Sequence, residues 1–153
     1  MTPAEWDVEI ILETIEAVPF DTDADIIGIS SMGHAVLRTI DLAREFKKRG
    51  KTVILGGYMV SLMPTEAQQY CDAVVIGDAE EVWNLLLKDW EAGTLQPFYQ
   101  KEIQSLEGLP LPRYDLLLPK KIGDFLPVQA GRGCPNACSF CSIYRSEERR
   151  GWE

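Results

Sequence analysis

Three short aliphatic runs, separated by longer amphipathic stretches, constrain the fold of this 153-residue chain more than any other feature of its sequence. The runs are Asp25–Ser30, Thr52–Gly56 and Ala73–Gly77, and each ends in Gly or Ser. A continuous run of β-branched residues is typical of a parallel strand that is buried on both faces. Alternation of such runs with helical stretches is typical of a parallel sheet with crossover helices. The sequence therefore predicts a parallel α/β domain built from repeated βα units.

The stretches between the runs predict the helices. A helix is predicted over residues 34–49, a short one over 65–70 and a longer one over 79–92. Their apolar faces are expected to pack on the sheet, and the tryptophans among them to lie in the core. The predicted faces are Val36, Leu37, Ile40, Ala43 and Phe46 in the first helix and Val82, Trp83, Leu86, Leu87 and Trp90 in the last.

The segments that flank this domain are less regular. Val8–Leu12 fits either a strand or the start of a helix, and a strand is the preferred interpretation. Residues 96–123 are rich in proline, which removes backbone donors and interrupts a regular ladder. Residues 125–129 are predicted to form a new strand. We therefore expect an α/β domain over 1–95, a linker over 96–123 and the beginning of a second domain over 124–153.

Charge and hydropathy narrow the classes of partner. The chain has 24 acidic and 15 basic residues, a net charge of −9, which argues against a surface that binds nucleic acid. No run approaches the roughly 20 apolar residues that span a bilayer, and the Met1 region lacks the pattern of a signal sequence. We expect a cytoplasmic protein that contacts neither nucleic acid nor membrane.

Cysteine usage points to a metal centre. Three of the four cysteines lie within eight residues, Cys134-Pro-Asn-Ala-Cys138-Ser-Phe-Cys141, a spacing that suits a metal site in a reducing compartment better than disulfides. Three thiolates on one loop can hold three irons of a cubane cluster and leave the fourth open. A zinc site would need a fourth ligand, and the only histidine, His34, lies in the other domain. Cys71 is expected to be a small buried hydrophobic residue.

The cysteine loop, with Phe140 before its last cysteine and Arg132-Gly133 ahead of it, resembles the signature of the radical S-adenosylmethionine superfamily. The resemblance implies that Cys134, Cys138 and Cys141 bind a 4Fe-4S cluster. The open iron would chelate the amino and carboxylate groups of S-adenosylmethionine, with Phe140 near the adenine, and an electron from the cluster would cleave it to a 5′-deoxyadenosyl radical. The resemblance also implies an electron donor such as flavodoxin or ferredoxin.

The strand ends carry a second resemblance. The segments Asp-Ile-Ile-Gly-Ile-Ser, Ile-Leu-Gly-Gly and Val-Ile-Gly-Asp-Ala-Glu are similar, in this order, to the flavodoxin-like cobalamin-binding domain upstream of some radical domains. By this resemblance Gly56 and Gly57 would let the corrin or its nucleotide tail approach the backbone, Ser30 and Ser31 would offer hydroxyls to the tail, and Gly77 would line the cofactor. The structural alternative is that the serines cap the helix near His34 and that Gly77 only turns the chain.

The sequence departs from these families in two ways. No Asp-x-His-x-x-Gly segment is present, so a bound cobalamin would lack a histidine ligand from the protein, and His34 is interpreted as a helix-terminus or solvent residue. The family usually has a strand and helix ahead of Val8 and a nearly complete barrel after the cysteine loop. Both are missing here, so we expect a fragment, a truncated gene product or one part of a split enzyme completed by a separate chain.

These features predict the N-terminal part of a cobalamin-dependent radical S-adenosylmethionine enzyme, with methyltransferase as the candidate activity, and we expect this chain alone to be inactive. One alternative is a radical protein whose first domain no longer binds cobalamin. Another is a small iron–sulfur carrier or electron-transfer module, which would tolerate an open iron without binding S-adenosylmethionine.

Overall fold

The computed structural model describes residues 1–103, 105–120, 128, 131–134, 136 and 138–141. The chain forms two compact units. The first contains Met1–Trp6 and Pro19–Ile103, and the second contains Asp7–Val18 and the described residues after Ile103. Within the described residues, no helix is both long enough and apolar enough to cross a membrane.

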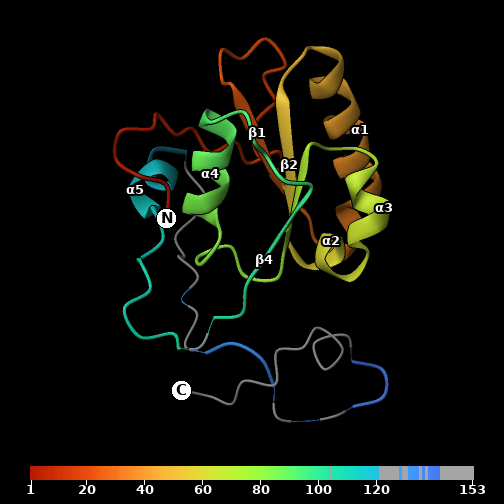
Figure 1. The fold of residues 1–153 in the computed structure, drawn as a ribbon, viewed down its shortest axis with the longest axis vertical. Coiled ribbons are helices and arrows are strands. Elements are labelled where there is room, and N and C mark those ends of the chain that lie inside the picture. The colour runs from red at the N-terminus through yellow and green to blue at the C-terminus, as the bar shows by residue number, and fades with distance from the viewer. Residues whose placement is uncertain (104, 121–127, 129–130, 135, 137, 142–153) are drawn as a thin grey trace. The chain divides into compact units, whose positions relative to one another are not determined.

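A parallel sheet of four strands forms the centre of the first unit (Figure 1). Its strands are β1 (Ile26–Ser30), β2 (Thr52–Gly56), β3 (Ala73–Ile76) and β4 (Phe98–Gln100), in this order across the sheet. The ladder pairs the last residue of β1 with the last residue of β2. The predicted flavodoxin-like parallel α/β class is confirmed.

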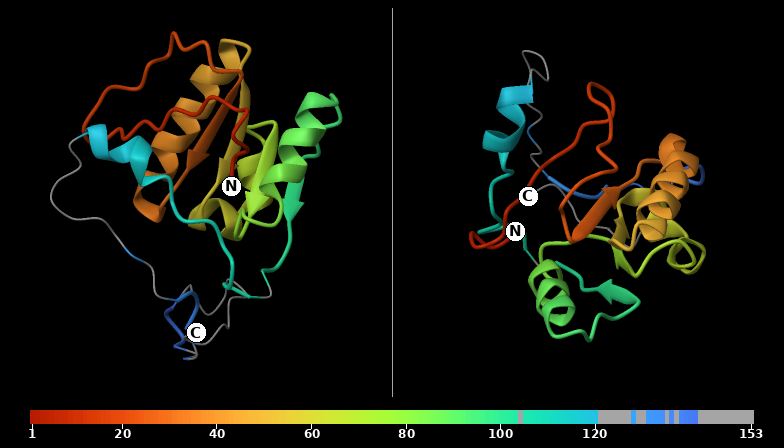
Figure 2. Two further views of the ribbon diagram at one scale, coloured as in Figure 1. Left: turned by 90° about the vertical axis from the view of Figure 1, so that its left-hand side faces the viewer. Right: turned by 90° about the horizontal axis from the view of Figure 1, so that it is seen from above.

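Helices follow each of the first three strands. The 3-10 helix η1 (Gly33–Ala35) and α1 (Val36–Lys48) follow β1, α2 (Tyr58–Leu62) and α3 (Pro64–Gln68) follow β2, and α4 (Trp83–Glu91) follows β3. Figures 1 and 2 show α4 on one face of the sheet and α1 with α3 on the other. The short α5 (Tyr114–Leu117) and η2 (Leu118–Lys120) belong to the second unit.

The core on the α4 side contains the stripe that the sequence predicts for this helix. The buried residues that pack together there are Ile54, Ala73, Val75, Val82, Leu86, Leu87 and Tyr99. Trp83 and Trp90 are only partly buried, because each indole N–H reaches the edge of the core and donates a 2.9 Å hydrogen bond to a threonine hydroxyl. The predicted stripe is confirmed for Val82, Leu86 and Leu87, but the prediction that its tryptophans lie in the core was wrong, because they lie at its margin.

The buried face of α1 differs from the predicted one. It consists of Thr39, Leu42, Ala43 and Phe46, whereas the Leu37 side chain is 74% exposed. An α-helix turns by about 100° per residue, so Leu37 lies about 180° around the helix from Phe46. The prediction of Leu37 as a core residue was wrong for this geometric reason.

Two predictions about strands also fail. No residue of β1 is buried, although a strand buried on both faces was expected, because in the described chain β1 pairs with β2 alone. Val8–Leu12 is not a strand. The Leu12 carbonyl instead accepts hydrogen bonds from the amides of Ile15 (2.9 Å) and Glu16 (3.1 Å), so this segment ends in a turn.

The strand β4 and the helix α2 were not predicted. β4 has only three residues, too few for a periodic pattern, and it follows Pro97, whose carbonyl still accepts the Val74 amide at 2.9 Å. Tyr99 anchors β4, because its buried ring packs in the core and its hydroxyl donates a 2.8 Å hydrogen bond to Asp89. The predicted strand over 125–129 lies, apart from Val128, outside the described residues.

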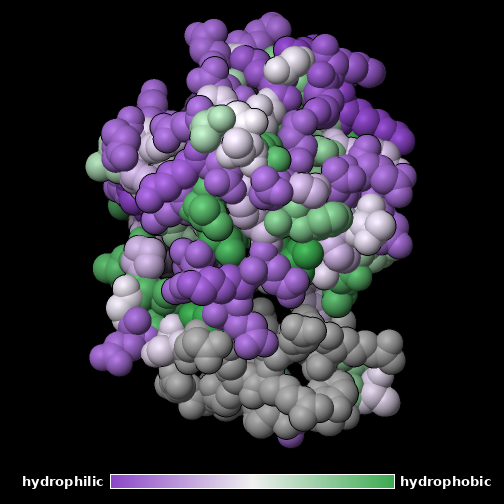
Figure 3. All heavy atoms as spheres, in the orientation of Figure 1, coloured by the Kyte–Doolittle hydropathy of each residue, from purple (hydrophilic) through white to green (hydrophobic). Residues whose placement is uncertain are grey.

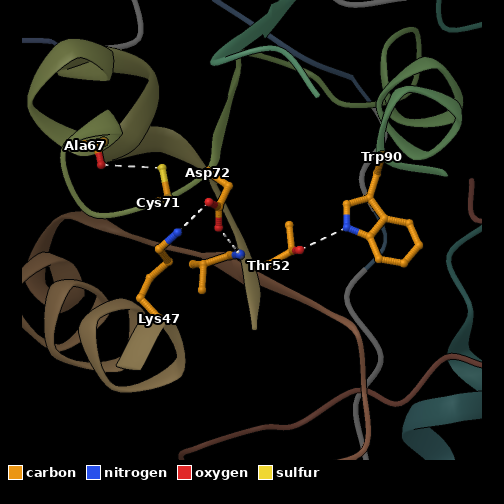
Figure 4. A network of polar contacts seen from close by, with 7 residues as sticks. Lys47, Thr52, Ala67, Cys71, Asp72 and Trp90 are labelled. Atoms are coloured by element: carbon orange, nitrogen blue, oxygen red, sulfur yellow. Dashed lines mark hydrogen bonds and ion pairs between the residues drawn. The ribbon is translucent and has the colours of Figure 1, made fainter. Parts of the chain in front are cut away.

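A polar network ties α1 to the amino ends of β2 and β3 (Figure 4). The Asp72 carboxylate accepts a 2.8 Å hydrogen bond from the Val53 amide and forms an ion pair with Lys47. The Asp72 amide in turn donates a 2.8 Å hydrogen bond to the Val53 carbonyl. Asp72 therefore clamps the start of β3 to the start of β2, which leaves the opposite ends of the strands to form the candidate site.

Candidate functional site

The loops that follow β1, β2 and β3 meet at the carboxyl edge of the sheet, because parallel strands end at the same edge. The ladder pairs Ser30 with Gly56, and the Ser31 amide donates a 3.1 Å hydrogen bond to the Gly56 carbonyl. The structure thus brings together the predicted residues of the first two loops.

Gly57 is the point where these two loops touch. Its φ is 88° and its ψ is 178°, a conformation that is essentially restricted to glycine. A Cβ atom at Gly57 would lie 2.7 Å from the Ser31 nitrogen and 2.8 Å from the Ser30 hydroxyl oxygen. At Gly56 the same atom would meet Val75 at an ordinary 3.7 Å. The two glycines therefore differ, and only Gly57 is required by close approach of the backbone.

The two serines after β1 lie in different environments. Ser31 is 1% exposed and its hydroxyl donates a 3.2 Å hydrogen bond to the Met32 carbonyl, whereas Ser30 is exposed. Neither η1 nor α1 has a side-chain hydrogen bond at its N-cap, so the interpretation of the serines as helix caps was wrong. Of the two serines, Ser30 is therefore the one accessible from solution.

Ser61 joins the loop after β2 to the loop after β3, and sequence analysis did not single it out. Its hydroxyl donates a 3.0 Å hydrogen bond to the Gly57 carbonyl and accepts a 2.8 Å hydrogen bond from the Gly77 amide. Gly77 has a φ of 73° and no described atom within 4 Å of a would-be Cβ, as its interpretation as a turn residue predicts. The sequence signal was a hydroxyl residue four positions after Gly57, where it can bond back to a helical carbonyl.

A tyrosine with a buried hydroxyl also lies in this region. Tyr58 begins α2, directly after the paired glycines, and its hydroxyl oxygen is buried with no hydrogen-bond partner among the described residues. Burial of an unpaired hydroxyl is costly, and a polar ligand group could offset that cost.

Methionines add apolar surface beside these polar groups. Met59 packs against Gly33, whose would-be Cβ lies 3.6 Å from the Met59 sulfur, and Met32 and Met63 are 63% and 46% exposed. Figure 3 shows hydrophilic side chains dominating the upper part of this view, where the amino ends of the strands lie. The carboxyl edge thus offers hydroxyls, backbone groups and adaptable apolar side chains, a combination suited to binding a large organic ligand.

His34 and Cys71, for which the sequence predicted structural rather than ligand-binding roles, lie where those roles require. His34 is exposed within η1, ahead of α1, as expected for a helix-terminus residue. Cys71 is 8% exposed, its thiol donates to the Ala67 carbonyl at 3.5 Å, and burial raises the pKa of the thiol to about 11. The prediction that Cys71 is a buried hydrophobic residue is confirmed.

The cysteine loop belongs to the second unit and is described in part. Cys134 and Cys141 are partly buried and Cys138 is exposed, as is Phe140 at 90%. The Cys141 backbone amide donates a 3.0 Å hydrogen bond to the Cys138 carbonyl, and the side-chain amide of Asn136 donates to the Cys134 sulfur at 3.6 Å. In the part of the chain that the structure describes, no three His, Cys, Asp or Glu side chains are arranged to hold a metal ion, so cluster ligation stays a prediction.

Comparison with known proteins covers most of the chain. Residues 2–87 match the family described as "B12 binding domain". The chain is 33% identical over 149 residues to bacteriochlorophyllide d C-8(2)-methyltransferase of Chlorobaculum tepidum, an alignment that covers 92% of this chain and 33% of the relative. It is 28% identical over 144 residues to bacteriochlorophyllide d C-12(1)-methyltransferase of the same organism, over 90% of this chain and 32% of the relative.

The chain therefore spans about a third of the length of these curated relatives. The family match, in contrast, extends over more than half of the chain and includes β1, β2, β3 and the three loops at the carboxyl edge. The chain belongs to the B12 binding domain family.

Proposed function

We propose that this chain is the N-terminal part of a cobalamin-dependent radical S-adenosylmethionine methyltransferase, and that its first unit binds cobalamin at the carboxyl edge of the sheet. The observation that carries the proposal is the close approach of Gly57 to the Ser31 backbone and the Ser30 hydroxyl, which joins the loops after β1 and β2 into one edge. Membership of the B12 binding domain family and the similarity to methyltransferases support it.

The residues at this edge fit cobalamin. The exposed Ser30 hydroxyl, and the buried Tyr58 hydroxyl that has no partner among the described residues, can bond the phosphate, ribose or amide groups of the cofactor. The exposed Met32 can contact its apolar parts. Bound cobalamin would supply a cobalt centre able to accept and donate a methyl group. No Asp-x-His-x-x-Gly segment is present, so we propose that the protein provides no histidine ligand to cobalt.

We further propose that Cys134, Cys138 and Cys141 hold a 4Fe-4S cluster. The donor set fits, because three free thiols on one short loop are the ligands that such a cluster takes. The cluster would supply the electron that cleaves S-adenosylmethionine. Phe140, which is exposed, would cover the adenine of the cosubstrate. An electron donor of the flavodoxin or ferredoxin type, a cytoplasmic location, and a barrel completed by further residues or by a separate chain remain parts of this proposal.

Corrinoid binding is tested by titrating the purified chain with hydroxocobalamin and measuring bound cobalt after equilibrium dialysis. We expect one corrinoid per chain. No binding at high micromolar concentration would overturn the cobalamin proposal, and a radical protein whose first domain is only a scaffold would then be the better description.

The cluster is tested by anaerobic reconstitution with iron and sulfide. We expect close to four irons and four sulfides per chain, lost in Cys134→Ser, Cys138→Ser and Cys141→Ser and retained in Cys71→Ala. Stoichiometric zinc without sulfide, or cluster loss in the Cys71 variant, would contradict the assignment of the three ligands.

A further inference from the structure

Ser61 occupies a position whose role the sequence analysis did not single out. It lies in the five-residue helix α2, and its hydroxyl is bonded on both sides, to the Gly57 carbonyl at 3.0 Å and to the Gly77 amide at 2.8 Å. We propose that Ser61 is a positioning residue for cobalamin, which holds the loop after β3 against the loop after β2. This inference rests on the proposed function.

The hydroxyl of Ser61 links three loops rather than two. Gly57, whose carbonyl it bonds, is pressed against Ser30 and Ser31 with no room for a side chain. Its other partner, Gly77, lies one residue beyond the end of β3, at an exposed position. The loops after β1, β2 and β3 therefore share one hydrogen-bonded junction with Ser61 at its centre.

The two contacts of Ser61 differ in what they contribute. The bond to Gly57 repeats a connection that the backbone already makes, because the Ser61 amide also donates to the Gly57 carbonyl at 3.0 Å. The bond from Gly77, in contrast, joins segments 16 residues apart. Removal of the hydroxyl should therefore leave α2 in place and release the Gly77 loop.

The chemistry of the junction indicates which part of cobalamin it serves. The loops present hydroxyls and backbone groups, which suit the phosphate and ribose of the nucleotide tail better than the apolar corrin face. Loops that diverge or move cannot bond such a tail at several points at once. Ser61 would thus act on the tail through the spacing of Gly57 and Gly77, without touching the cofactor itself.

The test compares two ligands that differ by the tail. Hydroxocobalamin and cobinamide, which lacks the nucleotide, are titrated into the full chain as wild type, Ser61→Ala, Ser61→Thr and Thr39→Val. Thr39→Val is the matched control, because the Thr39 hydroxyl is buried and, among the described residues, bonds the Ala35 carbonyl on the turn before it. We expect Ser61→Ala to raise the Kd for hydroxocobalamin about tenfold and to leave the Kd for cobinamide within about twofold.

Ser61→Thr, which keeps the hydroxyl, should restore most of the hydroxocobalamin affinity, and Thr39→Val should match the wild type with both ligands. In the ligand-free protein, hydrogen exchange of the Gly77 amide gives a second measurement. Ser61→Ala should accelerate this exchange, and Thr39→Val should leave it unchanged. Unchanged binding of both corrinoids in Ser61→Ala, or equal loss of both together with a lower Tm, would overturn the inference and leave the proposed function standing. Wild-type protein that binds neither corrinoid would overturn the proposed function itself.

Discussion

Gly56 and Gly57 look alike in the sequence, but the structure assigns them different roles. Only Gly57 combines a positive φ with a backbone neighbour 2.7 Å from the position of a Cβ atom. The resemblance to cobalamin-binding domains explains both glycines by the approach of the cofactor. The structure adds a reason that holds without any ligand, namely the contact between the loops after β1 and β2.

The first prediction follows from this difference. Gly57→Ala should lower the free energy of unfolding by about 3 kcal/mol or more, because the backbone conformation is nearly exclusive to glycine and the methyl group collides with main-chain atoms. Gly56→Ala should cost less than about 1 kcal/mol, since its methyl group meets Val75 at ordinary contact distance. Urea denaturation of both variants measures the contrast. Equal losses would show that the close approach at Gly57 is not a constraint.

The second prediction concerns the unpartnered hydroxyl of Tyr58. Tyr58→Phe should raise the stability of the ligand-free chain by about 1 kcal/mol, because it removes a buried polar atom that has no partner in the described residues. The same variant should bind hydroxocobalamin more weakly, since the hydroxyl is then missing from the site. Denaturation of one protein preparation measures the gain in stability, and titration of the same preparation measures the loss of affinity for hydroxocobalamin. A loss of stability in Tyr58→Phe would mean that the hydroxyl is already bonded in the ligand-free protein.

The third prediction concerns Cys71. A thiol with a pKa of about 11 is thiolate to only about 0.1% at pH 8, and the thiolate is the reactive form. In reduced, metal-free protein, three thiols should react with a thiol reagent, and the fourth only after denaturation. Cys71→Ala should show the same three in the native state and no fourth when unfolded. Four equivalents that react at one rate in native wild type would contradict the burial of Cys71.

At the scale of elements, the contacts that hold the sheet together and the candidate site lie at opposite ends of the strands in the first unit. Asp72 and its partners fasten the amino ends of β2 and β3, as Figure 4 shows, whereas Ser61 connects the loops at the carboxyl ends. Substitutions at the amino edge should therefore change stability without a selective effect on ligand binding.

The fourth prediction tests the clamp at the amino edge. Asp72→Ala should lower the free energy of unfolding by about 2 kcal/mol, because it leaves the amide of the buried Val53 without its acceptor. Asp72→Asn keeps an acceptor oxygen and should cost less than about 1 kcal/mol. Lys47→Ala should lower the free energy of unfolding by a similarly small amount, since the ion pair is partly exposed. If Lys47→Ala were as damaging as Asp72→Ala, the ion pair rather than the backbone hydrogen bond would dominate.

The sequence predicted the elements that have strong local patterns. Thr52–Gly56 matches β2 at both ends, and α1 lies within the predicted range, because aliphatic runs and amphipathic spacing are local signals. β4 was missed because a strand of three residues has no period to detect. The burial of β1 was overestimated because it depends on neighbouring strands, which the sequence of the strand does not specify.

The candidate site was predictable to a similar extent. Ser30, Ser31, Gly56 and Gly57 could be placed together because parallel strands end at one edge. Their separate roles, and the junction at Ser61, depend on hydrogen bonds between loops that no spacing rule gives.

At the scale of the whole molecule, the division into units does not follow the order of the chain. Asp7–Val18 belongs to the second unit, where the Glu16 carboxylate accepts two 2.9 Å hydrogen bonds from Lys120 and one of 2.8 Å from the Leu12 amide. The Leu12 amide first, and Lys120 second, hold the pKa of Glu16 below its ordinary value. Contacts across a hundred residues of sequence cannot be read from composition or periodicity.

The central claim is that the carboxyl edge holds cobalamin by its nucleotide tail, with the tail base drawn off the cobalt, and without a histidine ligand from the protein. Electron paramagnetic resonance of the chain loaded with one-electron-reduced cobalamin tests it most directly, because a nitrogen ligand to cobalt splits the cobalt lines into triplets. We predict that the free cofactor shows this splitting, from its own tail base, and that the protein-bound cofactor shows none. A bound cofactor that retains the nitrogen triplets would contradict the account, since either its tail or a protein nitrogen would then remain on the cobalt.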